Sequence, residues 1–302
     1  MEYTGKVPKY KLNRLLSAHE RKFQLHQKEG TGKPPHHQLS VISINSKSMQ
    51  LVDKFFLWKG LLTFGAGAGL ALIAWMLIGN ILISHEKPNG LAGDWGFLLA
   101  ILLMAIPVAL LNLWMLHKDL GFTHYPILLD RLNGKVHFFR QDGSINSSKW
   151  DDIFFCFGRV KNQTWEIQGH ILDAARKTVT DTFSFSEVGV GEQDRQQLLS
   201  YWEFVRTYME NGPSEIVSKI EACLPIAKTK ETFIFAMLRM RYILSGIPFP
   251  LQLILLAFYL LIYPARWIAM QASKTPEWPA ELEALCQAAP EDPYYRDAST
   301  NT

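Results

Sequence analysis

Residues Gly60–Ser84 read GLLTFGAGAGLALIAWMLIGNILIS and contain no acidic or basic side chain. Two later stretches, Trp95–Leu116 and Tyr242–Ala265, are apolar and uncharged in the same way. Each stretch is longer than the roughly 20 residues that a helix needs to cross a hydrocarbon core about 30 Å thick. The sequence therefore predicts a membrane protein in which a transmembrane helical hairpin is followed by a further membrane helix.

The average composition conceals a division of the chain into apolar and polar segments. A formal net charge of +3, 48% hydrophobic residues and 20% charged residues are ordinary values for a soluble protein of 302 residues. The apolar residues nevertheless gather in blocks. We expect five regions: a basic arm (1–53), the transmembrane hairpin (54–120), a polar domain (121–212), an interfacial helix with the third membrane segment (213–270), and a polar, proline-containing tail (271–302).

Basic residues are distributed unevenly around the first two apolar stretches. The amino-terminal arm is rich in lysine and arginine, whereas the connector His85–Asp94 contains only Lys87. Loops rich in lysine and arginine stay on the cytoplasmic side of a membrane. We therefore expect a multi-pass protein whose arm and polar domain are cytoplasmic and whose connector lies outside.

Small residues in the first stretch predict how the hairpin packs. Gly65 and Gly69 are four residues apart, a spacing that lets a second helix approach the backbone closely. We therefore predict that these two glycines pack against the second span. A phosphate-binding loop is the alternative for the run GAGAG, but the run lacks the preceding strand and the lysine of such a loop.

The polar domain carries strand signals followed by one helix. Asn133-Gly134 is the favoured pair for a tight two-residue hairpin, because both positions can adopt positive φ. After Gly191, one face of a predicted helix is apolar, through Leu198, Trp202, Val205, Tyr208 and Met209. The pattern predicts an α+β domain whose antiparallel strands lie at Ile127–Arg131, Lys135–Arg140, Asp152–Gly158, Thr164–Leu172 and Thr178–Ser186.

This order of strands, then one amphipathic helix, resembles the pleckstrin-homology-like domains of bacterial membrane proteins. A longer pattern is similar to an uncharacterised bacterial family whose members resemble components encoded beside type VI secretion effectors. The resemblance implies a bacterial inner-membrane protein with an immunity or accessory role, and it brings no active-site residues. The matching segments are SINSKSMQLVDKFF, LDRLNGKVHFFRQDG, KWDDIFF, TPEWPAELEALC and PEDPYYRD.

A docking platform fixed to the membrane needs contact surfaces more than it needs a small-molecule pocket. We take Trp150, Trp165 and Trp202 as candidate protein-contact residues, with burial in the core as the favoured alternative. The expected partners are membrane lipids and an effector or secretion-associated protein, with no nucleic acid and no cofactor. The runner-up function is a subunit of an oligomeric transporter or channel.

Catalytic and metal-binding patterns are weak. Asp151 and Asp152 are adjacent on a predicted strand, so their side chains should point to opposite faces. His36-His37 and the pair His124 and His137 lack a cysteine or carboxylate at familiar ligand spacing. Cys156 lies in the apolar run IFFCF and should be a buried, unreactive thiol. The sequence therefore predicts no catalytic residue and no metal site, and a protein that is not an enzyme.

The third apolar region permits two topologies. Glu231–Leu244 suits an interfacial helix, which Ser245-Gly246 and the following prolines should break, and Pro264 should interrupt the far end of the next segment. If that segment crosses the membrane, the acidic tail lies outside. If it re-enters, the tail stays beside the polar domain. A short helix is expected within the tail at Ala280–Ala288.

Overall fold

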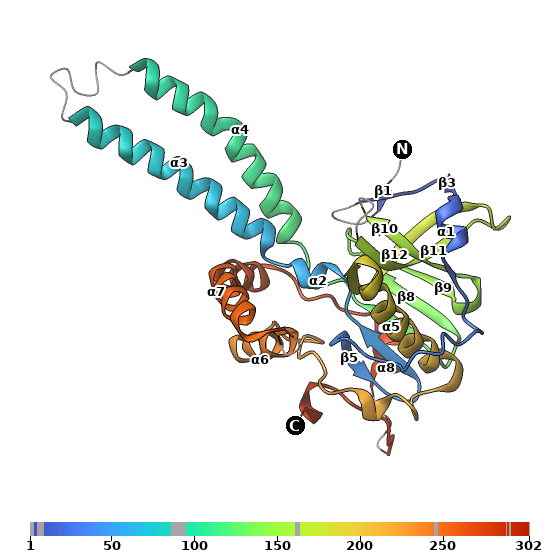
Figure 1. Ribbon diagram of the computed structural model, residues 1–302. Coiled ribbons are helices and arrows are strands. Elements are labelled where there is room, and N and C mark those ends of the chain that lie inside the picture. The colour runs from blue at the N-terminus through green and yellow to red at the C-terminus, as the bar shows by residue number, and fades with distance from the viewer. Residues whose placement is uncertain are drawn as a thin grey trace. The chain divides into compact units, whose positions relative to one another are not determined.

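The computed structural model in Figure 1 describes residues 3–4, 9–85, 95–160, 164–244, 247–287, 289 and 291–301. The chain forms an α+β protein made of two compact units. Unit 1 comprises Met1–Trp58, His124–Lys230 and Thr275–Thr302, and unit 2 comprises Lys59–Thr123 and Glu231–Lys274. Unit 2 is therefore built from two insertions into the chain of unit 1.

The first sheet of unit 1 is a meander of five antiparallel strands in the order β5-β6-β7-β8-β9. Although the first insertion separates β6 from β7 in the sequence, the two strands are neighbours, with Ser48 opposite Asp130 and Leu51 opposite Ile127. The strands are β5 (Val41–Ile44), β6 (Ser48–Leu51), β7 (Ile127–Asp130), β8 (Lys135–Phe139) and β9 (Ile145–Lys149).

The second sheet has the order β3-β12-β11-β10-β4 and is also antiparallel. Its long central strands are β10 (Phe154–Val160), β11 (Thr164–Leu172) and β12 (Thr178–Val190), and its short edges are β3 (Arg14–Leu15) and β4 (Gln24–Leu25). Smaller elements complete unit 1: β1 (Tyr3–Thr4), β2 (Tyr10–Lys11), α1 (Ala18–Lys22), α2 (Phe55–Trp58), α8 (Ala280–Cys286), and single turns at Trp150–Asp152, Val217–Lys219 and Ala298–Thr300.

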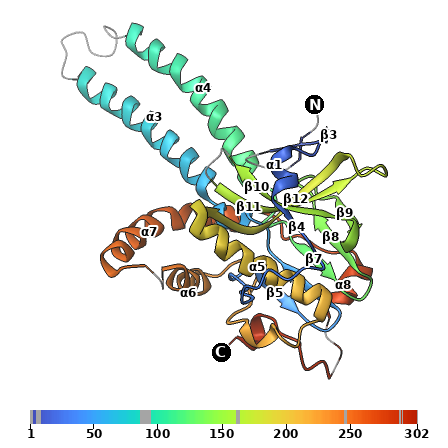
Figure 2. The same cartoon turned by 45° about the vertical axis from the view of Figure 1, so that its right-hand side comes forward.

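Helix α5 (Gly191–Asn211) packs against β11 and β12, and Figure 2 shows it in front of the strands. Its apolar face enters a core that both sheets share. Trp202 is fully buried, with its ring centroid 4.8 Å from that of Phe155. The predicted helix is therefore confirmed, and all five residues of its predicted apolar face are buried.

The five predicted strands are confirmed within a few residues, and the structure divides them between two sheets, with β7 and β8 in the first and β10 to β12 in the second. The prediction missed β9, and it missed β5 and β6 in the amino-terminal segment that we expected to be a separate arm. These two strands are buried on both faces, including the polar side chains of Ser43, Ser48 and Gln50. The sequence of β5, VISI, shows no alternation of polar and apolar residues, and the alternation in β6, SMQL, covers only four residues, so the pattern is too short to identify the strands by itself.

The tail also belongs to unit 1 and is not a separate region. The backbone of Arg296 exchanges two hydrogen bonds with Ile44 at the free edge of β5, each with an N–O distance of 2.9 Å. At the other end of the same edge, Leu224 N donates to Val41 O. Because these segments pair with β5, they cover an edge that would otherwise expose unpaired backbone groups. The predicted tail helix is present as α8.

The turn between β7 and β8 is longer than the predicted two-residue hairpin. Asp130 pairs with Lys135, which leaves a four-residue loop, and of its residues only Gly134 has positive φ, at 60°. The Asp130 carboxylate accepts hydrogen bonds from the backbone N and the Nδ2 of Asn133. This side chain closes the loop, so Asn133 does not need the left-handed conformation.

Gly134→Val should lower the free energy of unfolding by roughly 1 kcal/mol, because valine is strained at positive φ. No atom lies within 4 Å of the added Cβ, so the cost should come from the backbone alone. Gly134→Asn is the matched control, since asparagine tolerates this conformation. Thermal unfolding of the full chain measures both variants. Equal unfolding temperatures for the two would contradict the assigned turn.

Unit 2 contains α3 (Leu61–His85), α4 (Trp95–Asp119), α6 (Phe233–Leu244) and α7 (Phe249–Ala272). Three of these helices, α3, α4 and α7, are long and apolar enough to cross a membrane. The structure places Gly65 beside Met115 of α4 and Gly69 beside Asn112, whose Oδ1 lies 2.8 Å from where a Cβ would be. The predicted connector around Lys87 and the predicted break at Ser245-Gly246 lie outside the described residues.

The second insertion is a helical pair. Helix α6 packs on the carboxyl-terminal half of α7, where the Phe233 and Tyr263 rings are 5.1 Å apart and Tyr259 Oη donates to Ala236 O. Pro264 does not end α7 as expected, because the helix continues to Ala272. Apolar helices tolerate an internal proline where neighbouring groups satisfy the freed carbonyl.

Candidate functional site

A cavity of about 670 Å³ lies in unit 1 between β5, β6 and the tail. We call it the tail cavity. Cavities of roughly 300–1,000 Å³ are typical of ligand sites. Its lining comes from three parts of the chain: Ile42, Ser43 and Gln50; Leu224, Pro225, Ala227, Lys228 and Thr229; and Thr275, Pro276, Glu277, Trp278, Glu283, Cys286, Gln287, Tyr295, Asp297 and Ala298.

Polar side chains line the tail cavity, and one of them is buried without a partner. Ser43 is 8% exposed and Gln50 is 5% exposed. Among the described residues, the buried Nε1 of Trp278 has no hydrogen-bond partner. An unpartnered buried polar group costs about 1–3 kcal/mol, so a ligand that accepts a hydrogen bond from the Trp278 indole would be stabilised here.

Charged groups lie around the cavity on the tail side. Lys228 forms an ion pair with Glu283, and this hydrogen bond raises the pKa of the lysine. Tyr295 Oη donates to Asp297 Oδ2 at 2.7 Å. Burial raises the pKa of Cys286 to about 11, so its thiol stays protonated at neutral pH and is a weak nucleophile. The cavity therefore suits binding better than covalent chemistry.

The turn between β5 and β6 holds the tail in place through side chains. Asn45 Nδ2 and Ser48 Oγ both donate to Leu285 O, at 2.9 and 2.8 Å. Ser46 binds the Asp292 carboxylate through its backbone N and its Oγ, both at 2.8 Å. The segment Ser43–Gln50 (SINSKSMQ) thus binds the tail through hydrogen bonds, and no pattern in the single sequence indicates this role.

The three candidate contact tryptophans do not lie on the surface. Trp150, Trp165 and Trp202 are 3%, 5% and 0% exposed. Trp150 and Trp202 stack with ring centroids 5.7 Å apart, and Trp165 packs edge-on against Phe157. The structure therefore places them in the core, which is the alternative that the sequence favours. The residues of the tail cavity could not be identified from the sequence, because Ser43 and Gln50 belong to no recognisable motif.

The residues considered for catalysis are dispersed. Asp151 and Asp152 lie on a single 3-10 turn and not on the predicted strand, and they pair separately with Lys28 and Arg176. Cys156 is fully buried as predicted, and burial raises the pKa of its thiol. Across the described ranges, no group of three or more histidine, cysteine, aspartate and glutamate residues is arranged to hold a metal ion.

The four histidines considered as ligands make local contacts. His37 Nδ1 and Nε2 lie 3.2 Å from the backbone N of Leu39 and of Glu221, respectively. His137 Nδ1 is 2.7 Å from Ser147 Oγ. The ring of His124 packs edge-on against Phe56, and the ring of His36 stacks on His37.

Unit 1 should lose stability as the pH falls from about 6.5 to about 4. Burial, together with the neighbouring His36, lowers the pKa of His37 from 6.5 to about 4. The unfolded chain therefore binds a proton first, and about 3 kcal/mol of stability present at pH 7 is lost across this window. Unfolding temperatures of the full chain at pH 7 and pH 5 measure the loss. His37→Phe should reduce the difference between them, and an undiminished difference would contradict the assignment.

The fold and the site define an α+β protein with three potential membrane helices and a cavity lined by its own tail. Residues 100–290 match the model of a Family of unknown function (DUF6708), and the chain belongs to this family. The match covers α4, β7 to β12, α5 to α7 and much of the tail, but not β5 or β6. No curated protein and no solved structure matches the chain.

Proposed function

We propose that the protein is a bacterial inner-membrane interaction protein, an immunity or accessory factor in a type VI secretion context that acts by binding another protein. The observation that carries the proposal is the tail cavity, where the buried Nε1 of Trp278 has no partner among the described residues. Two antiparallel sheets followed by α5 support assigning unit 1 to the pleckstrin-homology-like domains. The basic amino-terminal segment supports a cytoplasmic position for this domain.

The chemistry of the cavity favours a peptide segment as the bound group. A carboxamide, a hydroxyl and an indole N–H supply uncharged donors and acceptors, which match the amide groups of a polypeptide. The lysine of the lining, Lys228, is already paired with Glu283, so the cavity does not favour an anionic ligand. Apolar neighbours such as Ile42 and Leu224 suit the side chains of the same segment.

The transporter alternative lacks a comparable observation. Between Leu61 and Ser84, and between Trp95 and Leu116, the spans contain no acidic or basic side chain. Intramembrane charges usually mark ion and substrate pathways. We therefore favour binding over transport.

Gln50→Leu should weaken binding of the partner protein at least ten-fold while leaving unit 1 folded. The substitution removes the carboxamide from the cavity lining at similar volume, and a buried polar group is replaced by an apolar one. The unfolding temperature should therefore stay the same or rise. Gln24→Leu, at an exposed position on β4, is the matched control.

A competition assay between bacterial strains tests the immunity role. A strain lacking this protein faces an otherwise isogenic attacker that carries the effector encoded beside it. The full chain should restore survival, and the Gln50→Leu variant should fail to do so although it is present in the membrane at the same level. Unchanged survival after deletion would contradict the immunity role, and full rescue by Gln50→Leu would contradict the assigned docking site.

A further inference from the structure

Four passages of the chain meet in a buried polar cluster at one end of unit 2. Lys59 Nζ donates to Phe122 O at 2.8 Å and to Ser273 Oγ at 2.6 Å. The Asp119 carboxylate accepts from Thr63 N and Thr63 Oγ1, at 2.9 and 2.7 Å. The cluster therefore holds together the start of α3, the end of α4 and the end of α7.

An ion pair adds the start of α6 to this cluster. Arg266 of α7 donates to Glu231 at 2.5 Å and to Lys59 O at 3.2 Å, and both charged side chains are buried. Glu231 lies two residues before Phe233, the first residue of α6. Because α3 begins and α4 ends here, the cluster marks the membrane surface from which the helical hairpin projects.

Unit 1 restricts how the second insertion can meet the membrane. Its strands and tail pair with one another, as Ile44 does with Arg296, so all of its segments lie on one side of the bilayer. The insertion Glu231–Lys274 must therefore return to the side that it leaves. Helix α6 has 12 residues and is roughly 18 Å long, too short to cross a core of about 30 Å. A single crossing by α7 would place the tail on the wrong side.

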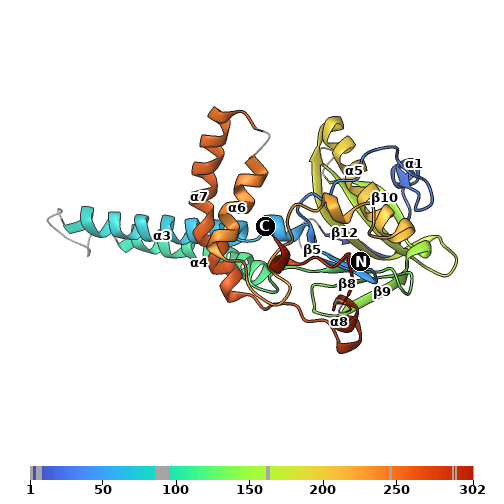
Figure 3. The ribbon, with the colours of Figure 1, turned by 90° about the horizontal axis from the view of Figure 1, so that it is seen from below.

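The direction of α7 shows how it avoids crossing. Figure 3 shows α6 and α7 running across the α3–α4 hairpin instead of alongside it, and the end-on appearance of α7 in Figure 1 agrees. The contact between α7 and α3 includes the close approach of Gly60 and Arg266, near the end of α7. When α3 and α4 stand upright in the bilayer, α7 lies along its surface.

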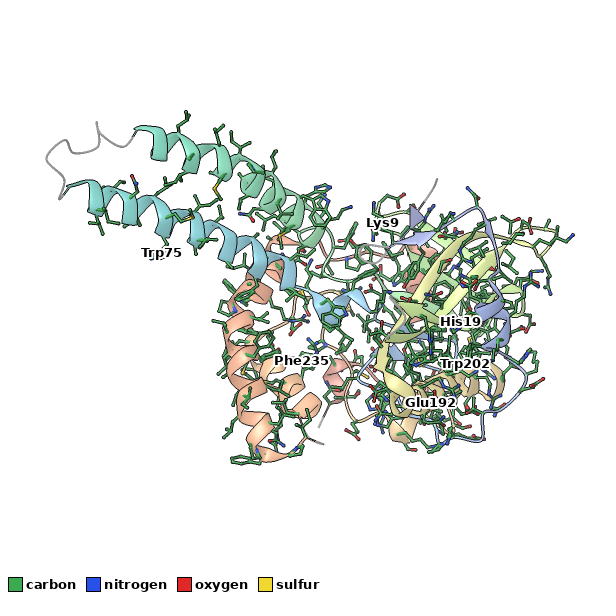
Figure 4. The ribbon with its side chains drawn as sticks, turned by 45° about the horizontal axis from the view of Figure 1, so that its top comes forward. Lys9, His19, Trp75, Glu192, Trp202 and Phe235 are labelled. Atoms are coloured by element: carbon green, nitrogen blue, oxygen red, sulfur yellow. The ribbon has the colours of Figure 1, made fainter. Side chains whose placement is uncertain are left out.

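The exposed side chains of α7 require an apolar environment. Figure 4 shows them projecting around the helix as they do on α3, where Trp75 is labelled. Ile254, Phe258 and Leu261 are more than half exposed, and the only charged residue of α7 is the buried Arg266. So much exposed apolar surface is not stable in water, and because α7 packs against α3 of the transmembrane hairpin, lipid is its environment.

We propose that α6 and α7 form an in-plane membrane hairpin, which lies in the lipid interface on the same side as unit 1. The Glu231–Arg266 pair joins the start of α6 to α7, and the hydrogen bond from Arg266 to Lys59 O fixes α7 to the transmembrane hairpin. The bound surface is the bilayer interface itself. The contacts of Arg266 and Ser273 with Lys59 thus orient α7 against the transmembrane hairpin, independently of any protein that the tail cavity binds.

Spin labels at Ile254, Leu261 and Ile268 test this arrangement in the full chain reconstituted in liposomes. Cys286→Ser is the background, because Cys156 and Cys223 are buried. Collision rates with oxygen and with a water-soluble nickel complex report the depth of each label. Leu103 on α4 serves as the deep control and Leu132 in unit 1 as the aqueous control; both side chains are exposed.

The three α7 labels should share one shallow depth, between those of the two controls. A steady change in depth from Ile254 to Ile268 would overturn the proposal, because it indicates a helix that crosses or re-enters the bilayer. Labels shielded from both quenchers would also overturn it, because a protein surface would then cover α7.

Discussion

A valine at Gly60 should detach α7 from the start of α3. Gly60 has φ of 90°, and a Cβ there would lie 2.6 Å from the backbone N of Arg266. Strain at positive φ and overlap with a neighbouring backbone each cost on the order of 1–3 kcal/mol, and a backbone cannot rotate away as a side chain can. We expect a total loss of roughly 3 kcal/mol or more, with separation of the two helices.

Distances between spin labels on α3 and α7 measure this separation. Leu70 and Trp267 are suitable label positions, because both side chains are about half exposed. Gly67→Val is the matched control, since nothing lies within 4 Å of a Cβ at that position. A single, unbroadened distance in Gly60→Val, equal to that of the control, would show that the close approach does not hold α7.

Lys54→Met should destabilise unit 1 by about 3–5 kcal/mol. Lys54 Nζ lies 2.5 Å from Glu166 Oε2, and both side chains are almost completely buried. Removal of one member of a buried ion pair leaves the other charge without compensation. Tyr10 Oη and Gln168 Nε2 also donate to Glu166, but neither carries a positive charge.

The double variant Lys54→Met, Glu166→Gln separates charge from packing. Once both charges are gone, the second substitution should recover most of the lost unfolding temperature, because neutral groups are less costly to bury. Thermal unfolding of the full chain in detergent gives the comparison. A double variant that is no more stable than Lys54→Met would contradict the role of the ion pair.

The membrane helices and the long strands could be predicted from the sequence because their signals are local. An uncharged run such as Gly60–Ser84 has few alternatives to a membrane helix. Strands β10 to β12 and the apolar face of α5 repeat at the periods of strand and helix. The boundaries of α7 were predicted less well, because proline at 264 does not end this helix.

The binding of the tail by the turn between β5 and β6 could not be predicted, because it depends on contacts between residues that are distant in the sequence. Ser46 meets Asp292, and Asn45 meets Leu285, across most of the chain length. In the sequence, the polar side chains of β5 and β6 indicate a segment exposed to solvent. In the structure they are buried. Similarly, no pattern in the sequence indicates that Lys54, which lies between the basic arm and the first apolar stretch, is paired with Glu166 inside the fold.

The central claim is that the amino-terminal segment, the sheets and the tail form one domain on one side of the membrane. Labelling of introduced cysteines by a membrane-impermeant reagent in intact cells tests it most directly. Cysteines at Ser17, Ser147 and Ser299 should all be shielded, while a cysteine at Asn89, which lies outside the described residues, is labelled. Labelling at Ser299 with Ser147 shielded would contradict the account, because α7 would then cross the membrane and the tail could not pair with β5.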